Sequence, residues 1–198
     1  MIQEVIELDR ALFEAVNGLV GRSPWLDGLM RLLVNEYFVP VSMSLVLLAL
    51  WFSGANPHLR KANQRAVLYA ILAQGLSAAI IAANNGLYFR PRPFATLPVN
   101  LLYYRPTDSS FPSNPAAMAF TFALVIWLFH RRAGAGLLLL ALLFSFARVY
   151  CGVHLPSDIL GGAAVGGIAA LLATVILKGM VEPLFRIAIG LARSFYLA

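Results

Sequence analysis

The sequence predicts an all-α protein, a polytopic membrane bundle of about five to six helices that begins with an amphipathic interfacial helix. Three observations carry this prediction. Of the 198 residues, 60% are hydrophobic and only 12% are charged, and the mean hydropathy is +0.77; soluble domains have about 25% charged residues. One small core cannot remove so much apolar surface from water, so lipid is the expected solvent for most of the chain. The length suits a single domain over residues 1–198.

The N-terminal segment, residues 3–20, is expected to form an amphipathic helix that lies at the membrane interface. Its apolar residues recur at helical spacing, namely Val5, Leu8, Leu12, Phe13, Val16 and Leu19. A helix with one apolar and one charged face binds in the plane of the interface. The charges among the first 20 residues also argue against a cleavable signal peptide. Residues 25–36 are mixed in character and are assigned no span.

Five apolar segments are predicted to cross the membrane: residues 37–53, 66–84, 115–130, 134–150 and 158–177. The last is rich in glycine and alanine, which allows helices to pack closely. Residues 54–65 are a predicted polar loop, and residues 85–114 are the longest polar and aromatic connection. An amphipathic tail covers residues 183–198. A crossing by residues 1–36 would make the number of crossings six.

The basic residues collect on one side of this predicted bundle. With five spans, loops 54–65 and 131–133 and the segment after residue 177 share a face. That face holds eight of the fifteen Lys and Arg residues and one acid, Glu182. The positive-inside rule places this face in the cytoplasm, so loops 85–114 and 148–158 are expected to face outward.

Composition also limits the partners. The net charge of +6 is explained by loop charges at the ends of apolar segments, and no nucleic-acid partner is expected. Cys151 is the only cysteine, which excludes an internal disulfide and a cysteine-based zinc site. The oligomeric state is left open.

The outward-facing loops concentrate ionisable residues. Arg90 and Arg92 alternate with prolines in a stiff segment, and Arg148 lies near the end of an apolar span. His154 follows six residues later, and Asp158 four residues after that. An ionisable group at membrane depth is costly and is therefore a functional-site hypothesis, and guanidinium groups match phosphate oxygens in geometry. A histidine oriented by a carboxylate and facing a phosphate is arranged as a nucleophile.

The stretch SSFPSNPAAMAF, residues 109–120, adds a helix start to this site. Ser113 is expected to cap the span 115–130, whose first N–H groups would point at the same anion. Each residue also has an ordinary explanation: Arg92 as a loop charge, Ser113 as a helix cap, Asp158 as a first-turn acid. Their convergence on one face favours a phosphate site.

Three motifs of this region resemble a known family. The strings RPRPF, SSFPSN and ARVYCGVHLPSDILGG are similar to the signature motifs of the type 2 phosphatidic acid phosphatases, the membrane branch of the PAP2/haloperoxidase superfamily. The N-terminal string LDRALFEAVNGLVGRSPWLDGLM is similar to bacterial undecaprenyl-diphosphate phosphatases of that group. The third motif, Arg-x5-His-x3-Asp, is complete and is the most specific of the three.

The resemblance implies a helical enzyme without a metal or cofactor in a bacterial-type cytoplasmic membrane, and the charge distribution described above places its active site on the outward face. It implies that His154 attacks phosphorus to form a phosphohistidine and that Asp158 orients the imidazole. The phosphate-binding residues that it implies are Arg92, Ser113, Asn114 and Arg148. Arg90 and Asn85 are secondary candidates.

Two positions depart from the family pattern. The first motif has a lysine where this sequence has Asn85, and the second has a histidine where it has Pro115. The missing histidine would protonate the leaving group, an effect of about 10²- to 10⁴-fold in rate. Proline cannot do this, although it suits the first turn of a helix. A lipid phosphate that leaves from a diphosphate needs little protonation, so the expected substrate is a lipid diphosphate, such as a polyprenyl diphosphate.

Other readings of these residues are open. A catalytically degenerate relative would bind, sense or transport a lipid phosphate; Asn85 and Pro115 favour it, whereas the complete set of Arg148, His154 and Asp158 favours the phosphatase. A phosphotransferase that uses the same histidine is also open. A channel or transporter has little support, because no span carries a row of polar residues and the sequence has no inverted repeat.

Overall fold

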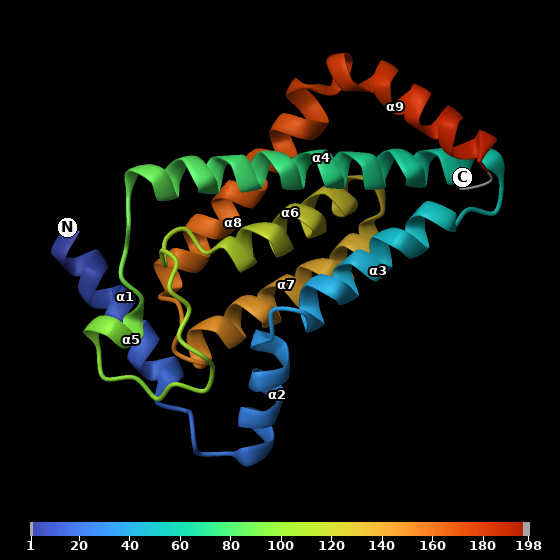
Figure 1. Ribbon diagram of the computed structural model, residues 1–198. Helices are drawn as coiled ribbons and strands as arrows, with labels where there is room; N and C mark the ends of the chain where they lie inside the picture. Colours follow the sequence, from blue (N-terminus) through green and yellow to red (C-terminus); the bar gives the residue numbers. More distant parts are fainter. Residues whose placement is uncertain (1, 196–198) are drawn as a thin grey trace.

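The computed structural model describes residues 2–195, and within that range the chain consists of helices and connecting segments without a strand (Figure 1). The predicted all-α class is confirmed. The helices are α1 (Ile2–Asn17), α2 (Pro24–Val34), α3 (Phe38–Phe52), α4 (Pro57–Leu87), α5 (Pro93–Thr96), α6 (Asn114–Phe129), α7 (Arg131–Tyr150), α8 (Pro156–Leu171), the π-helical turn η1 (Leu172–Ile176) and α9 (Lys178–Ser194).

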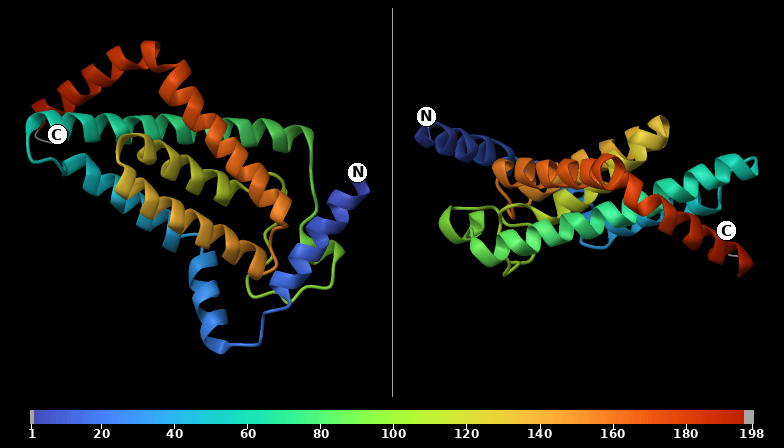
Figure 2. Two further views of the ribbon diagram at one scale, coloured as in Figure 1. Left: turned by 180° about the vertical axis from the view of Figure 1, so that it is seen from behind. Right: turned by 90° about the horizontal axis from the view of Figure 1, so that it is seen from above.

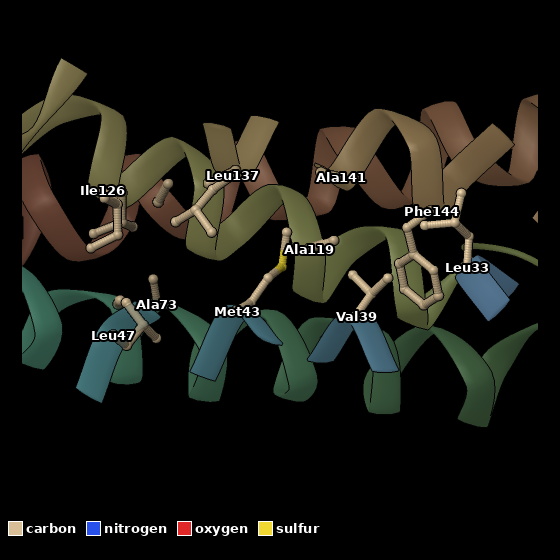
Figure 3. Packing of buried hydrophobic residues seen from close by; sticks show 14 of the residues in the cluster. Leu33, Val39, Met43, Leu47, Ala73, Ala119, Ile126, Leu137, Ala141 and Phe144 are labelled. Atoms are coloured by element: carbon tan, nitrogen blue, oxygen red, sulfur yellow. The ribbon is translucent and has the colours of Figure 1, made fainter. Parts of the chain in front are cut away.

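Helix α6 lies at the centre of the bundle and packs against α4, α7 and α8 (Figures 1 and 2). Its inner surface is lined by small residues, so the neighbouring helices approach closely. Helix α3 also packs against this core. Val39, Met43 and Leu47 point from α3 into a cluster that also holds Ala119 of α6 and Phe144 of α7 (Figure 3).

The predicted spans correspond in position to α3, α4, α6, α7 and the continuous pair α8–η1. Three of these helices are by themselves long and apolar enough to cross a membrane: α4, α7 and Pro156–Ile176. Helices α2 and α3 meet the same test only as a pair that bends by 57°, and α6 is a shorter apolar helix of 16 residues.

Some predicted boundaries are wrong. Residues 57–65 of the predicted loop 54–65 are helical, because α4 already begins at Pro57, with the Asn56 side chain accepting a hydrogen bond from Leu59 N at 2.9 Å. The polar residues that follow are adequate helix formers and extend α4 to 31 residues. The tail helix begins at Lys178 instead of 183, and residues 196–198 of the predicted tail lie outside the described residues.

The connections gather at two opposite ends of the bundle (Figures 1 and 2). The site end carries α1, the segment 88–113 with α5, and the segment 151–155. The opposite end carries residues 53–56 and the turn at His130, with α9 nearby. The predicted motifs therefore reach one end of the molecule from three separate parts of the chain.

Candidate active site

A cavity of about 440 Å³ opens at the site end of the bundle. Its lining combines two arginines, two acids, polar groups and apolar residues, which are Glu36, Pro40, Gln74, Arg92, Asp108, Asn114, Pro115, Met118, Phe144 and Arg148. Four of the predicted residues, Arg92, Asn114, Pro115 and Arg148, therefore line one cavity.

Arg92 lines this cavity and also contacts His154. The residue precedes α5 in the stiff segment after α4, and its side chain is only 3% exposed. Its Nη2 donates to Asp108 Oδ1 at 2.8 Å, and its Nη1 donates to the Val153 carbonyl at 2.9 Å. The same Nη1 lies 3.1 Å from Nε2 of His154. Arg92 thus has the Asp108 carboxylate on one side and the imidazole on the other.

The contacts of His154 assign its tautomer. The side chain is fully buried in the connection between α7 and α8, and its Nδ1 lies 3.1 Å from the carbonyl oxygen of Ser110. A carbonyl oxygen only accepts hydrogen bonds, so Nδ1 carries the proton and Nε2 keeps its lone pair. That lone pair accepts the hydrogen bond from Arg92.

Burial also determines the charge of the imidazole. It lowers the pKa of His154 to about 4; the Asp158 carboxylate opposes this shift, while Arg148 and Arg92 reinforce it. At neutral pH the ring is uncharged, with a free lone pair on Nε2. This is the protonation state that a nitrogen nucleophile requires.

Asp158 lies in the first turn of α8 and is held by several donors. Its Oδ2 accepts from Ser110 Oγ at 2.5 Å and from Leu155 N at 2.8 Å, and its Oδ1 accepts from Arg90 Nη1 at 2.7 Å. Oδ2 lies 3.7 Å from Nδ1 of His154, farther than the Ser110 carbonyl. The carboxylate therefore lies beside the protonated nitrogen of the imidazole, and Ser110 contacts both groups.

Arg148 is buried with few protein partners. Its side chain is 1% exposed, its Nη1 donates to the Val34 carbonyl at 3.2 Å, and its guanidinium lies over the rings of Tyr103 and Phe144. Among the described residues, its Nε has no hydrogen-bond partner. A buried guanidinium with unused donors that lines a cavity is suited to an anion.

The start of α6 forms another wall. Ser113 is buried and caps the helix, because its Oγ accepts from Ala116 N at 3.4 Å, and its own N–H donates to the Asp158 carbonyl at 2.9 Å. Asn114 and Pro115 follow in the first turn and line the cavity. The predicted cap and the position of Pro115 in the first turn are both found.

Two predicted secondary candidates lie elsewhere. Asn85 is exposed near the end of α4 and does not belong to the cavity lining. Arg90 lies behind Asp158, where it forms ion pairs with Asp158 and Asp9 and donates to Ser157 Oγ at 2.7 Å. The structure therefore places Arg90 against the carboxylate and away from the cavity.

Sequence reasoning missed several residues of the site. Ser110 stands within the motif SSFPSN, but nothing in the sequence indicates that its carbonyl and hydroxyl reach His154 and Asp158. Gln74 could have been identified as a site candidate from the sequence, because it is a polar residue in the middle of an apolar span. Its buried Oε1 has no hydrogen-bond partner among the described residues. Glu36 lies at the α2–α3 junction, where it accepts a hydrogen bond from the Tyr104 hydroxyl.

Comparisons with known proteins identify the family of this chain. Residues 64–180 match the model of the PAP2 superfamily. YbjG of Escherichia coli strain K12 is 32% identical over 181 residues, which are 90% of this chain and 87% of that protein. Undecaprenyl-diphosphatase BcrC of Bacillus subtilis strain 168 is 34% identical over 154 residues, 78% of this chain and 76% of BcrC. The crystal structure of Aquifex aeolicus LpxE superimposes with a TM-score of 0.67 at 32% identity, covering 84% of this chain and 94% of LpxE.

Proposed function

The chain belongs to the PAP2 superfamily and is an integral membrane lipid phosphatase, and from this premise we propose its substrate and its chemistry. The substrate is a polyprenyl diphosphate of the undecaprenyl type, and the reaction is hydrolysis through a phosphohistidine. One observation carries the proposal: the buried His154 directs the free lone pair of Nε2 at Arg92, an arginine that lines the cavity.

The reaction follows from this orientation in two steps. In the first, Nε2 donates its lone pair to the terminal phosphorus, the N–P bond forms, and the P–O bond to the lipid phosphate breaks. Arg92 Nη1 transfers its hydrogen bond from Nε2 to the phosphoryl oxygens. In the second step, water attacks phosphorus and the N–P bond electrons return to Nε2. Both hydrogens of the water leave with the product as dihydrogen phosphate.

The residues that line the 440 Å³ cavity bind the phosphoryl groups. Arg92 and Arg148 provide guanidinium donors, and the start of α6 provides Asn114 and the positive end of a helix dipole. Asp108 pairs with Arg92 and is 57% exposed, so an incoming phosphate can take its place. Such charge-assisted hydrogen bonds are stronger than those between neutral groups.

Pro115 favours a diphosphate over a monoester. It lines the cavity at the position where the family pattern has the histidine that protonates the leaving group. A lipid alkoxide is a poor leaving group and requires a proton, an effect of about 10²- to 10⁴-fold. A lipid phosphate accommodates the negative charge on its own oxygens. The rate of diphosphate hydrolysis is therefore lowered less by having proline instead of histidine at position 115.

A second cavity suits the lipid tail. It has a volume of about 570 Å³ and is lined almost entirely by apolar residues, namely Ser44, Leu47, Leu48, Trp51, Phe52, Val67, Leu68, Ile71, Phe122 and Ala192. On α3, Pro40 of the first cavity is one turn from Ser44 of the second. On α6, Met118 and Phe122 are related in the same way. A headgroup and an apolar chain can therefore bind along the same helices.

The orientation belongs to the same proposal. The opposite end of the bundle carries most of the basic residues, and basic loops remain on the cytoplasmic side of a membrane. The site end then faces outward from the cytoplasmic membrane. A phosphoryl group on the outer surface of the membrane reaches the cavity without crossing the bilayer.

The test is phosphate release by the purified protein in detergent. An undecaprenyl diphosphate is expected to release phosphate faster than phosphatidic acid, and His154→Ala is expected to abolish release without unfolding the protein. Equal or faster turnover of phosphatidic acid would refute the leaving-group argument. Binding of phosphate without turnover of either lipid would instead identify the degenerate binding protein.

A further inference from the structure

We propose that Asp9, in the N-terminal interfacial helix, is a positioning residue for the catalytic centre and acts on Asp158 through Arg90. This inference rests on the proposed function for what His154 and Asp158 do. It extends that function to α1, which lies outside residues 64–180 that match the family model.

The contacts of Asp9 join α1 to the start of α8. Asp9 Oδ1 accepts from Ser157 N at 2.8 Å, and Oδ2 accepts from Ser157 Oγ at 2.5 Å, although the two residues are 148 positions apart in sequence. Oδ2 also lies 3.3 Å from Arg90 Nη2. The Asp9 carboxylate is only 10% exposed, so these bonds are shielded from water and from salt.

Arg90 carries the effect to the catalytic carboxylate. Its Nη2 faces Asp9, whereas its Nη1 donates to both Asp158 Oδ1 and Ser157 Oγ at 2.7 Å. The guanidinium is planar and rigid, so fixing one edge fixes the other. Asp9 thus sets the orientation in which Arg90 presents Nη1 to Asp158.

The position of α1 is itself well defined. Asp9, Phe13 and Asn17 are spaced by four residues, and all three are buried on the face that packs against the protein. Asn17 Nδ2 donates to the Tyr150 carbonyl at 2.8 Å, next to the connection that holds His154. Helix α1 is therefore fixed at both borders of that connection: at the end of α7 by Asn17 and at the start of α8 by Asp9.

Another stripe of α1 is apolar and exposed. Val5 is 60%, Leu8 59% and Leu12 48% exposed, as expected for a helix that lies in the membrane interface. The same helix therefore presents one stripe that is suited to lipid and a second stripe that contacts Ser157 and Arg90. The distinctive consequence is that loss of Asp9 should slow chemistry and leave substrate binding intact, because the cavity arginines are not touched.

The kinetic test compares Asp9→Asn with Glu14→Gln, a change on the exposed side of α1 that serves as the matched control. Asp9→Asn is expected to lower kcat by roughly ten- to a hundredfold, the scale of a small misplacement of a reacting group. KM and the inhibition constant for inorganic phosphate should stay unchanged, because Asp9 does not line the cavity in which the phosphate would bind. A KM that rises as much as kcat falls would overturn the proposal.

A double-mutant cycle tests the route through Arg90. If Asp9 acts through Arg90, then Asp9→Asn added to Arg90→Gln should cause no further loss of kcat beyond that of Arg90→Gln. Additive losses would contradict that route. Ser157→Ala removes a hydroxyl that donates to Asp9 Oδ2 and accepts from Arg90 Nη1, so it loosens both groups of this route and is expected to reproduce the kcat loss. It replaces Asp9→Asn if that variant fails to fold, and an unchanged kcat in a folded variant contradicts the proposal.

Hydrogen exchange provides a readout that does not depend on turnover. Leu155 N donates to Asp158 Oδ2 and not to Asp9, so faster exchange at Leu155 in Asp9→Asn would show that the carboxylate has moved. Exchange at Ala117, whose amide belongs to the start of α6, should not change. An unchanged rate at Leu155 overturns the proposal. If the parent protein hydrolyses no lipid diphosphate, the proposed function fails. The hydrogen-exchange rate at Leu155 still tests whether Asp9 positions the Asp158 carboxylate.

Discussion

At the scale of single residues, the chemistry of the site depends on the two sides of one imidazole. The Ser110 carbonyl accepts a hydrogen bond from the protonated Nδ1, and Arg92 faces Nε2. Asp158 lies beside Nδ1, where in the proposed mechanism it would stabilise the positive charge that develops on the ring when Nε2 attacks. A backbone carbonyl, which no substitution at Ser110 removes, is therefore the group that leaves the lone pair on Nε2, the nitrogen of the proposed attack.

The pH dependence of catalysis follows from the environment of His154. Burial lowers the pKa of His154 to about 4, below the ordinary value near 6.5. The nucleophile is neutral above that pKa and loses its lone pair only as the pH falls through it. The acid limb of kcat/KM attributable to the enzyme is therefore expected below pH 5. It is measured between pH 4 and 8, with the ionisation of the substrate followed separately by phosphorus NMR. An enzyme limb near 6.5 would contradict this.

Pro115→His tests the leaving-group argument directly. A histidine there supplies a proton donor, so hydrolysis of a lipid monophosphate is expected to rise by about 10²-fold, the lower range of general acid catalysis. Hydrolysis of the diphosphate should rise much less, because its leaving group needs no proton. Pro115→Ala removes the proline without adding an acid and is the control. An equal rise for both substrates would indicate a disabled phosphatase.

At the scale of helices, the contact between α6 and α8 positions two walls of the site. A Cβ added at Gly166 would lie 2.8 Å from the Ala117 carbonyl oxygen and 2.9 Å from Thr121 N, both backbone atoms of α6. A Cβ at Gly162 would lie 2.5 Å from the Ser113 carbonyl oxygen, beside the cap of α6. The backbones therefore approach too closely for any side chain at these positions.

Gly166→Ala is expected to lower the free energy of unfolding by about 1–3 kcal/mol, the usual cost of overpacking. Gly167→Ala is the matched control, because a Cβ there would lie 3.8 Å from Leu124 Cδ1, an ordinary contact. Thermal unfolding in detergent measures both. Gly162→Ala should in addition lower activity, because it displaces Ser113. Equal midpoints for the Gly166 and Gly167 variants would show that α8 adjusts without strain.

The helices also show how far local sequence reasoning reaches. The start of α6 was predictable, because Ser113 is a good cap and Pro115 suits the first turn. The same signal, Asn56 followed by Pro57, marks the start of α4, but the apolar pattern begins only after Arg65. Hydropathy identifies the part of a helix that contacts lipid or core, whereas the helix itself continues wherever the backbone is capped and the residues tolerate it.

At the scale of the whole molecule, the site is assembled from parts that no local pattern relates. The resemblance to a family brought together Arg92, Arg148, His154 and Asp158. It did not indicate that Asp9 of α1 reaches Ser157, because that contact depends on how an interfacial helix folds back over the bundle. Nor did it indicate that Asn85 would be exposed, since that depends on the rotation of α4 at its last turns.

The polar cavity and the apolar cavity follow each other along α3 and α6. KM is therefore expected to depend on the length of the lipid chain. Ser44 lies on α3 between the polar cavity and the apolar one, and its hydroxyl donates to the Pro40 carbonyl at 2.8 Å. Ser44→Phe is expected to raise KM for a long polyprenyl diphosphate and to leave KM for a short one, such as a farnesyl diphosphate, unchanged. Ser42→Phe, which lies on α3 outside the lining of both cavities, is the control. A rise in KM for both lengths would place the tail elsewhere.

The two ends of the bundle predict the orientation in the membrane. At the opposite end, the acid Glu182 is paired with Arg65 and accepts from the Tyr69 hydroxyl at 2.7 Å, so it does not balance the other basic residues there. Thr107 is exposed at the site end, and Ala55 is exposed at the basic end. Single cysteines at these positions can therefore report which end faces outward.

Thr107→Cys is expected to react with a membrane-impermeant maleimide in intact cells, and Ala55→Cys only after permeabilisation. The parent protein is the control and should stay unlabelled, because Cys151 is buried and burial raises the pKa of its thiol to about 12. A maleimide reacts with the thiolate, which is scarce at neutral pH for such a group. Labelling of Ala55→Cys but not of Thr107→Cys in intact cells would contradict the predicted orientation. The site would then face the cytoplasm, and the lipid substrate would lie in the cytoplasmic leaflet.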